Sequence, residues 1–313
     1  TAELLDICVK LCIVKMKQGR KLMFWEQLLN GLTLGSTYAL IALGYTMVYG
    51  IIQLINFAHG EIYMFGAFVG LFLVSVAGVN IFIALLGAMA FCMVLGMLVE
   101  KVAYRPLRGK STRLSALISA IGVSIFLSTL MALIRGTNTT RYPEVMQIHT
   151  YNLGLIEISS LQLIILLVSA FLMVGLQMMV QRTTIGKAMR ACSQDLEASY
   201  LMGINVNRVI SFTFAIGSAL AAAGGVMVGL YYNAVWPYMG MMAGLKAFAA
   251  AVLGGIGSIP GAMIGGVTLG VLEIFGVAYL SSSYKDAIAF AVLILVLIIR
   301  PQGIMGQKIS KKV

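Results

Sequence analysis

The residues best placed for chemistry are three polar side chains, Asn56, His59 and Glu61, that lie within an otherwise apolar part of the chain. Runs without Asp, Glu, Lys or Arg flank Glu61, at 27–60 and 62–99. If these runs cross a bilayer, Glu61 is a carboxylate at membrane depth, which costs about 3 kcal/mol and is by default functional or paired. The same residues also fit the polar end of a helix at the interface, where Glu61 would interact with the free amides of the next helix. Both interpretations stay open on the sequence.

Two further charges, Lys246 and Glu273, each stand alone in a long apolar stretch. A buried charge needs a partner, because an unpaired charge in an apolar interior is strongly unfavourable. We therefore expect Lys246 and Glu273 to form one structural ion pair that holds two late helices together.

The residue types give enzyme chemistry little support. The chain has no HExxH or GxSxG motif, and its histidines and cysteines show no metal-ligand spacing. The run Arg108-Gly109-Lys110-Ser111 ends like a phosphate-binding loop, but that motif needs a glycine at the position of Tyr104 and a preceding strand. The sequence therefore predicts no catalytic residue, no metal, no cofactor and no ATP hydrolysis by this chain.

The elements that must position these residues are membrane helices. Hydrophobic residues make up 60% of the chain, charged residues make up 11%, and the mean hydropathy is +0.97. A soluble domain carries about 25% charged residues, so this chain cannot cover a water-facing surface. A spanning helix needs roughly 20 apolar residues. Charge-free stretches of that length or longer lie at 27–60, 62–99, 114–134, 158–181, 209–245 and 247–272.

The net charge of +11 comes from basic residues gathered in short segments between the apolar stretches. Such clusters mark the cytoplasmic side of a membrane protein, and they leave no separate basic face for nucleic acid. The clusters are Lys101, Arg105, Arg108, Lys110 and Arg113; Arg182, Lys187, Arg190 and Arg208; and Arg300, Lys308, Lys311 and Lys312.

The stretches and clusters together predict an all-α integral membrane bundle of about eight to ten transmembrane helices. Two helices joined by an outer loop at about 135–157 fit the stretch 114–181, and the alternating residues 147–158 favour a small hairpin. Three or four crossings fit the first third, depending on whether the segment near 50–60 spans or turns back. Four crossings fit between Arg208 and Arg300, at about 209–231, 243–256, 260–279 and 286–299.

Glycine-bearing breaks interrupt the apolar runs near Ala58–Gly60 and near Gly254–Gly261. Many polytopic membrane proteins consist of repeats whose broken helices lie at corresponding positions, so we expect a two-repeat architecture. Small residues spaced four apart, as in Gly31–Gly35 and Gly266–Gly270, let helix backbones approach closely in lipid.

The most informative water-facing piece is the segment 183–208. A helical pattern broken near 192–195 has one apolar face, and Gly203 is a natural helix stop. Such a face must be buried against another surface, although a plain loop between helices remains the alternative. The members of the apolar face are Ile185, Met189, Leu196, Tyr200 and Ile204.

Three regions, 28–70, 185–205 and 246–266, resemble the permeases of high-affinity branched-chain amino-acid ABC transporters. The second contains Glu197-Ala198-Ser199 and Gly203, which closely match the Glu-Ala-Ala-xxx-Gly signature of ABC importer permeases, although the later part of that signature is absent. The resemblance runs from about residue 23 to the C-terminus. The first region carries Asn30-Gly31-Leu32-Thr33-Leu34-Gly35-Ser36-Thr37-Tyr38-Ala39-Leu40, and the third carries Leu253-Gly254-Gly255-Ile256-Gly257-Ser258-Ile259-Pro260-Gly261.

This resemblance implies a type II ABC importer-like fold with one transmembrane permease domain, 23–313. Residues 1–22 are expected to be a non-native or disordered extension. Segment 183–208 is expected to couple the permease to the ATPase, through Gly186, Arg190, Asp195, Glu197, Ala198 and Gly203. The translocation pathway or its gate is expected at Asn56, His59, Glu61, Gly254, Gly255 and Gly257.

The partners that the resemblance implies are a second, related permease, two ATP-binding subunits, a periplasmic amino-acid-binding protein and the lipid bilayer. The implied setting is the bacterial inner membrane, and the implied activity is import of leucine, isoleucine or valine by alternating access. Related permeases for urea, amides or other amino acids are an alternative. An ion-coupled secondary transporter would need carboxylates arranged on broken helices, and a passive channel would need a polar ring in its pore.

Overall fold

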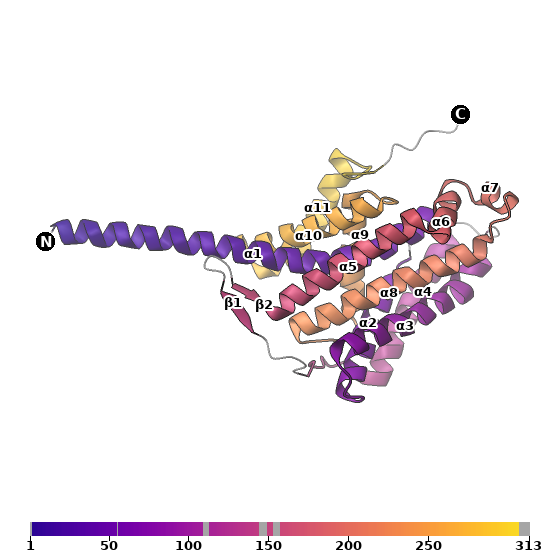
Figure 1. The fold of residues 1–313 in the computed structure, drawn as a ribbon, viewed down its shortest axis with the longest axis horizontal. Coiled ribbons are helices and arrows are strands. Elements are labelled where there is room, and N and C mark those ends of the chain that lie inside the picture. The colour runs from indigo at the N-terminus through magenta and orange to yellow at the C-terminus, as the bar shows by residue number, and fades with distance from the viewer. Residues whose placement is uncertain (1, 55, 109–112, 144–148, 153–156, 307–313) are drawn as a thin grey trace.

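A computed structural model describes residues 2–54, 56–108, 113–143, 149–152 and 157–306, with side chains from Met23 onward except that of Arg113. It is a helical bundle with one small hairpin (Figure 1). The expectation for residues 1–22 stays a prediction, and residues 109–111 of the run that resembles a phosphate loop lie outside the described residues.

The helices are α1 (Ala2–Ile52), α2 (His59–Ser75), α3 (Ile81–Val99), α4 (Arg113–Arg135), α5 (Ser160–Arg182), α6 (Thr184–Gln194), α7 (Leu196–Leu201), α8 (Val206–Tyr232), α9 (Met239–Gly254), α10 (Ile259–Tyr279) and α11 (Lys285–Ile299). Shorter elements are the π-helical turn η1 (Glu100–Tyr104), the 3-10 turns η2 (Arg105–Leu107) and η3 (Ser282–Tyr284), and the strands β1 (Thr150–Asn152) and β2 (Glu157–Ser159).

The helix count agrees with the sequence. Within the described residues seven helices are long and apolar enough to cross a membrane, and α2 and α9 are two shorter apolar helices. Seven and two give nine, inside the predicted range of eight to ten. Helices α8 to α11 occupy the four crossings predicted before Arg300, and α4 and α5 the two predicted within 114–181. In the first third the segment near 50–60 does not span; α1 ends at Ile52 and α2 starts at His59.

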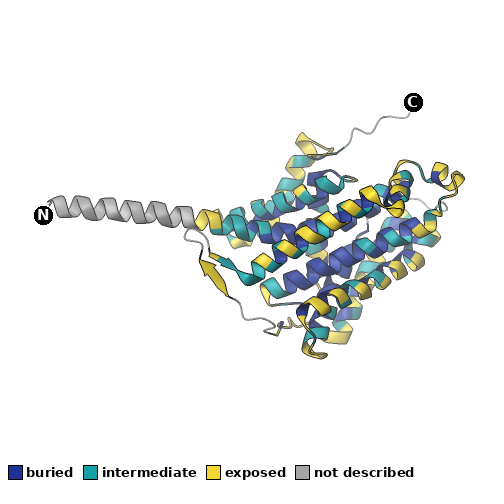
Figure 2. Cartoon of the chain, viewed as in Figure 1, coloured by how far each residue is buried: buried dark blue, intermediate teal, exposed yellow. Residues whose placement is uncertain are grey.

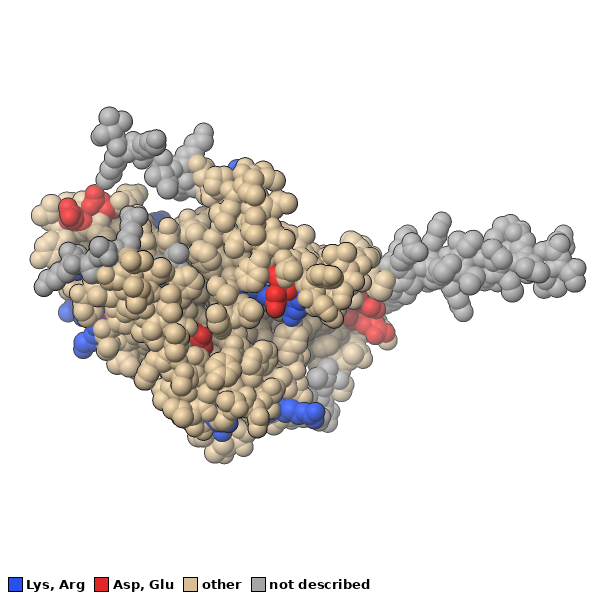
Figure 3. Space-filling view, turned by 180° about the vertical axis from the view of Figure 1, so that it is seen from behind, with Lys and Arg blue, Asp and Glu red and all other residues tan. Residues whose placement is uncertain are grey.

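The bundle has a buried centre and an exposed apolar periphery. In α1 and α8 the most apolar window is 83% buried, whereas in α11 it is 6% buried. Figure 2 shows α8 buried along most of its length, while α4 and α5 carry many exposed positions. The face in Figure 3 is largely uncharged, with few Lys, Arg, Asp and Glu side chains. An apolar periphery of this kind suits lipid or partner helices as its surroundings.

Helices α1, α2 and α3 are built like α8, α9 and α10. Each first helix ends in a left-handed residue that is not glycine, Gln53 with φ 52° and Asn233 with φ 51°. The next helix then begins with an equivalent backbone hydrogen bond. The His59 N–H donates to the Asn56 carbonyl, and the Met239 N–H donates to the Trp236 carbonyl, each at 3.1 Å. Both pairs of corresponding residues, Gln53 with Asn233 and His59 with Met239, are 180 positions apart in the sequence. Helix α3 packs along α8 as α10 packs along α1, and α2 packs on α8 as α9 packs on α1.

This correspondence supports the predicted two-repeat architecture but changes which breaks match. The sequence pattern predicted that the break near Ala58–Gly60 corresponds to the glycine-bearing break at 254–261. In the structure, the counterpart of the link 53–58 is instead the link 233–238. Trp236 and Pro237 occupy that second link, so it has no glycine pattern to reveal it. The second repeat unit consists of α8, α9 and α10. Because an odd number of apolar helices, α1 to α5, precedes α8, this unit would enter the membrane from the side opposite to α1, as in inverted repeats.

The predicted hairpin is present where the structure describes it. Strands β1 and β2 pair antiparallel, with Tyr151 opposite Ile158, and Ser159 with Gln162 forms a capping box at the start of α5. The Gln162 amide also donates to Asn30 Oδ1 of α1 at 2.7 Å. This bond places the beginning of α5 beside the outer part of α1.

Glycines form the contact between α1 and α10. A Cβ on Gly270 would collide with the backbone of Gly35, and a Cβ on Gly266 would collide with that of Ala39. The two small-residue motifs in the sequence therefore pack against one another, which brings two central helices to backbone contact.

We predict that Gly270→Ile destabilises the protein by about 1–3 kcal/mol, because the new side chain cannot fit without moving α1. Thermal unfolding of the detergent-purified protein measures the effect. Gly122→Ile is the matched control, since a Cβ there meets no atom within 4 Å. Equal unfolding midpoints for both variants would contradict the close α1–α10 contact.

Candidate functional site

The structure brings Asn56, His59 and Glu61 together inside the bundle, at the start of α2. All three are 1% exposed. The left-handed Gln53 ends α1, and the link 53–58 then turns the chain back into the interior. Each of these residues is therefore enclosed by protein rather than exposed at a surface.

The N-terminus of α9 meets the N-terminus of α2 at this place. A Cβ on Gly60 would collide with the Gly240 carbonyl oxygen, and a Cβ on Gly240 would lie 2.6 Å from Glu61 Oε2. Each helix start carries the positive end of a helix dipole, although the amides of His59, Glu61 and Met239 are hydrogen-bonded to nearby carbonyls of the chain. The Glu61 carboxylate therefore lies where two positive helix ends converge.

The hydrogen bonding of this cluster is incomplete. Asn56 Oδ1 accepts from the Tyr104 hydroxyl at 2.8 Å, and Glu61 Oε1 accepts from the Ser124 hydroxyl at 3.1 Å. Within the described residues Asn56 Nδ2, His59 Nε2 and Glu61 Oε2 are buried without a partner. Each unpaired group of this kind costs about 1–3 kcal/mol. A short segment with three such buried atoms is suited to contacting a polar ligand.

An aromatic wall adjoins the cluster. The ring centroids of Tyr45 and His59 lie 4.8 Å apart in a T-shaped arrangement, and those of Tyr45 and Phe248 lie 6.1 Å apart. A void of about 10 Å³, the size of one water molecule, continues from Tyr45 and Phe248 toward Ala251 and Ile256. This small void lies between the aromatic wall and the turn between α9 and α10.

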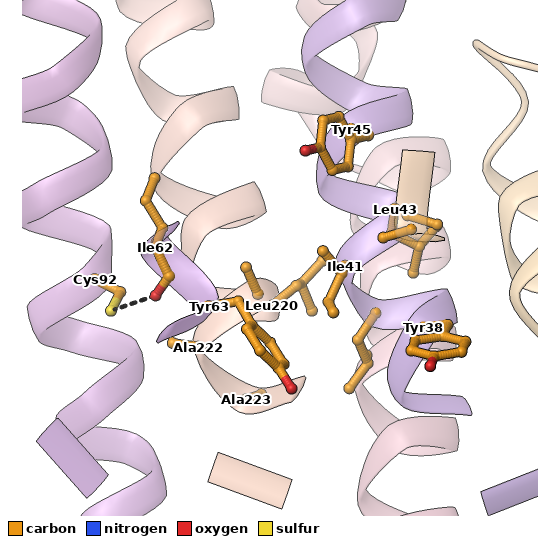
Figure 4. Packing of buried hydrophobic residues seen from close by; sticks show 14 of the residues in the cluster. Tyr38, Ile41, Leu43, Tyr45, Ile62, Tyr63, Cys92, Leu220, Ala222 and Ala223 are labelled. Atoms are coloured by element: carbon orange, nitrogen blue, oxygen red, sulfur yellow. Dashed lines mark hydrogen bonds between the residues drawn. The ribbon is translucent and has the colours of Figure 1, made fainter. Parts of the chain in front are cut away.

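Apolar side chains pack around the first turns of α2 (Figure 4). Ile41 of α1, Tyr63 of α2 and Leu220 of α8 belong to one buried core. On α3 the Cys92 thiol donates to the Ile62 carbonyl at 3.6 Å. These contacts hold the start of α2 in place, so the bundle is closed around the polar residues in this conformation.

The glycines Gly254, Gly255 and Gly257 lie at the other end of α9, away from the polar cluster. Gly255 has φ 106° and Gly257 has φ 93°, a region that only glycine adopts readily. The chain near the C-terminus is bonded to this turn: Met305 N–H donates to the Gly254 carbonyl at 2.9 Å. The turn is thus attached to the segment that follows α11.

Lys246 and Glu273 lie 3.0 Å apart, in a larger network than the predicted pair. Lys246 also contacts Asp286 at 2.7 Å, and Lys285 contacts Glu273 at 3.4 Å. The Tyr38 hydroxyl donates to Glu273 Oε1 at 3.2 Å. Two lysines and two carboxylates balance in charge, and the network joins α1, α9, α10 and α11.

The segment 183–208 forms two short helices at one end of the bundle. Thr183 caps α6, and Asp195 caps α7 by accepting from the amides of Glu197 and Ala198. A Cβ on Gly186 would collide with the end of α5, so this glycine lets α6 fold back onto that helix. Gly203 ends the segment with φ 81°.

The apolar face of this segment differs from the prediction. Met189 is buried against the bundle, whereas Tyr200, Leu201 and Met202 are 73%, 84% and 83% exposed. The turn at 194–195 rotates α7 relative to α6, which a single helical pattern cannot anticipate. The exposed apolar side chains therefore form a protruding tip, Tyr200–Met202. Arg190 lies on α6, where its guanidinium donates to the Gln181 carbonyl at 3.3 Å.

Sequence reasoning missed Tyr45, Tyr104 and Ser124, which contact the cluster from α1, η1 and α4. For Tyr45 and Ser124 the available signal was a hydroxyl in an otherwise apolar stretch, but many such hydroxyls bond only to their own helix, as Ser128 does. Tyr104 stands in a charged segment, where a hydroxyl gives no such signal. Among the described residues no group of three or more His, Cys, Asp and Glu side chains could hold a metal ion.

Comparisons with known proteins agree on one family. Residues 27–297 match the family described as branched-chain amino acid transport system / permease component. The high-affinity branched-chain amino acid transport system permease protein LivH of Escherichia coli (strain K12) is 48% identical, over 93% of this chain and 98% of its own. BraD of Pseudomonas aeruginosa, a permease protein of the same description, is 47% identical over 93% of this chain and 98% of its own. The solved structure of PsaBC from Streptococcus pneumoniae in complex with Fab shares the fold, with a TM-score of 0.52, 13% identity, and coverage of 92% of this chain and 96% of that one.

We predict that Lys246→Met destabilises the protein by about 3 kcal/mol, because it leaves Asp286 without its lysine and Glu273 with Lys285 alone. The double variant Lys246→Met/Glu273→Gln should recover part of that loss, since it removes the unbalanced buried charge. Thermal unfolding in detergent measures both, and Lys101→Met at an exposed lysine is the control. A Lys246→Met variant as stable as the control would show that the network does not hold the helices together.

Proposed function

The chain belongs to the family of branched-chain amino acid transport system permease components, and we propose that it carries leucine, isoleucine and valine across the bacterial inner membrane. It is a multi-pass membrane protein of that family. The observation that supports the substrate most strongly is the likeness to LivH and BraD over 93% of the chain. The energy for import would come from ATP hydrolysis on two separate subunits.

The basic clusters orient the protein in this proposal. Arg105, Arg108, Arg182 and Arg208 lie at the end of the bundle that carries α6 and α7, so that end faces the cytoplasm. Three crossings by α1, α2 and α3 then place Met23 on the periplasmic side. The hairpin before α5 faces the periplasm as well, where a binding protein would deliver the substrate.

The tip Tyr200–Met202 is the proposed contact with the ATPase subunits. Its large apolar side chains protrude on the water-facing side, where an unpartnered apolar surface is unfavourable. The Asp195 cap and the Gly203 turn fix α7 at both ends, so movement of an ATPase would reach α8 through a rigid segment. Glu197 and Ala198 occupy the first turn of the same helix, and Gly186 and Arg190 join α6 to the end of α5.

The cluster at the start of α2 is the proposed substrate contact within the membrane. Glu61 Oε2 could accept from an α-ammonium group, and Asn56 Nδ2 could donate to an α-carboxylate near the two helix ends. The wall formed by Tyr45 and Phe248 suits an aliphatic side chain. These complementary chemistries match a zwitterionic, aliphatic amino acid, and the His59 ring contacts the Tyr45 side of the wall.

Helix α4 is the proposed moving cover of this cluster. Its most apolar window is only 17% buried, and it packs mainly on α2 and η1. Its Ser124 hydroxyl is the group that contacts Glu61. Displacement of α4 would therefore expose the cluster to a pathway shared with a second permease.

The glycine turn is the proposed gate at the cytoplasmic end of that pathway. Gly254, Gly255 and Gly257 lie between α9 and α10, beyond the aromatic wall. Because the C-terminal segment is bonded to this turn, the two would move together as the ATPases close.

Uptake of labelled leucine into proteoliposomes tests the proposal. The vesicles hold the permease with its partner permease, the two ATPase subunits and the binding protein. We expect uptake only with ATP inside the compartment that contains the ATPases. Uptake driven by an ion gradient without ATPase subunits would contradict the ATP-driven mechanism, and uptake of urea in preference to leucine would contradict the substrate.

In the same assay we expect Leu201→Asp to lower uptake at least about tenfold, because a carboxylate in an apolar contact loses more than 1.4 kcal/mol. The protein should still reach the membrane, since Leu201 is 84% exposed and contributes little to folding. Leu280→Asp is the matched control, with a leucine 73% exposed at the opposite end of the bundle. Equal uptake by both variants would remove the assignment of the tip.

A further inference from the structure

A second polar site lies at the end of the bundle that carries α6 and α7, between the end of α3 and the start of α8. A cavity of about 470 Å³ opens there, a size common for ligand sites. Arg105, Asn205, Asn207, Arg208 and Ser211 form its polar lining. Neither the substrate cluster nor the tip Tyr200–Met202 shares a residue with it.

The positive charge of this site exceeds its negative charge. Glu100 is fully buried and accepts from Arg105 at 3.1 Å, from Ser211 at 2.7 Å and from Arg108. Two arginines thus share one carboxylate, and a third, Arg208, lines the same cavity. Burial lowers the pKa of the Arg108 guanidinium below its usual value, and the Glu100 carboxylate offsets only part of that shift.

One of the two arginines that line the cavity, Arg105, is held in position rather than free. The Arg105 guanidinium donates to Glu100 and to the Ser211 hydroxyl, the latter at 2.8 Å. It follows directly after the π-helical turn η1, which replaces the regular end of α3. Such turns are often found at functional sites, and here the turn precedes the residue that lines the cavity.

Arg208 differs, because its side chain makes no hydrogen bond or ion pair within the described part of the chain. It stands in the first turn of α8, a helix of 27 residues capped by Asn205. The unpaired amides of that helix start add to the positive field. The Arg208 guanidinium, which has no partner among the described residues, lies near Arg105 and the positive end of α8. It is therefore available to an anionic ligand.

The remaining lining is apolar and continues onto the membrane-facing surface. Met97 and Phe212 complete the cavity, and Met97 is 38% exposed. Next to it on α3 and η1, Leu98 and Val102 are 56% and 68% exposed. A ligand that fills the cavity therefore needs an anionic head and an apolar tail running along α3.

We infer that this cavity binds the phosphate headgroup of an anionic phospholipid from the cytoplasmic leaflet, with an acyl chain along Met97 and Phe212. Basic pockets between transmembrane helices on this side of a membrane are suited to such headgroups. An inorganic phosphate would use the arginines but not the apolar wall. Because α8 follows the tip Tyr200–Met202 directly, the bound lipid would steady the start of α8 against α3.

Native mass spectrometry of the purified protein, exchanged into mixtures of phosphatidylglycerol and phosphatidylcholine, tests this inference. The wild type should retain phosphatidylglycerol in preference to phosphatidylcholine. Arg208→Gln should lower the retained phosphatidylglycerol about tenfold, the loss expected for one charge-assisted hydrogen bond. Arg208 is exposed and has no side-chain hydrogen bond or ion pair among the described residues, so this variant should fold normally. Arg182→Gln is the matched control, an exposed arginine at the end of α5, outside the cavity.

A second variant tests the apolar wall without touching the charges. Met97→Trp fills part of the cavity and should reduce lipid retention while leaving Arg105 and Arg208 unchanged. Equal retention of the two lipids by the wild type would overturn the inference, as would equal retention by Arg208→Gln and Arg182→Gln. Displacement of the lipid by millimolar inorganic phosphate, or by the ATPase subunits in the assembled complex, would also overturn it by showing a different occupant.

Discussion

The contact between Gly60 and Gly240 is the constraint on which the rest of the structure depends. Inside a bilayer every backbone polar group needs a partner, so a helix start is tolerated only where protein encloses it. Here two helix starts face one another at the centre of the bundle. Their helix dipoles make this a polar place within a largely apolar interior, and Glu61 lies beside it.

The surrounding helices keep that arrangement closed. Glycines bring α1 to backbone contact with α10, and the network of Lys246, Glu273, Asp286 and Lys285 ties the late helices to α1 through Tyr38. At the other end Glu100 joins α3 to α8. Helix α4 is the loose element in this frame, since few of its positions are buried. A rigid frame with one loosely packed cover is suited to opening on one side at a time.

The sequence predicted the spans well, because charge-free run length and basic clusters report directly on membrane depth. It also predicted that Asn56, His59 and Glu61 belong together, and that Lys246 and Glu273 need partners. It could not supply Asp286 and Lys285, which join the network only after α11 packs beside α9. It paired the wrong breaks, because Gln53 and Asn233 reach the left-handed region without being glycine. The sequence did not predict the protruding tip Tyr200–Met202. Its exposure depends on the rotation of α7 relative to α6, and a single helical period cannot describe two helices with a break between them.

The central claim is that the pathway opens where α2 and α9 meet, beneath α4. The most direct test is the labelling of a cysteine at position 124, in a protein whose native cysteines are replaced, by a charged thiol reagent that does not cross membranes. In the assembled transporter, Ser124→Cys should be labelled from the periplasm in one nucleotide state and protected in the other. Phe126→Cys, on the exposed side of α4, should show no such change. Labelling of position 124 that is the same in every nucleotide state would contradict the account.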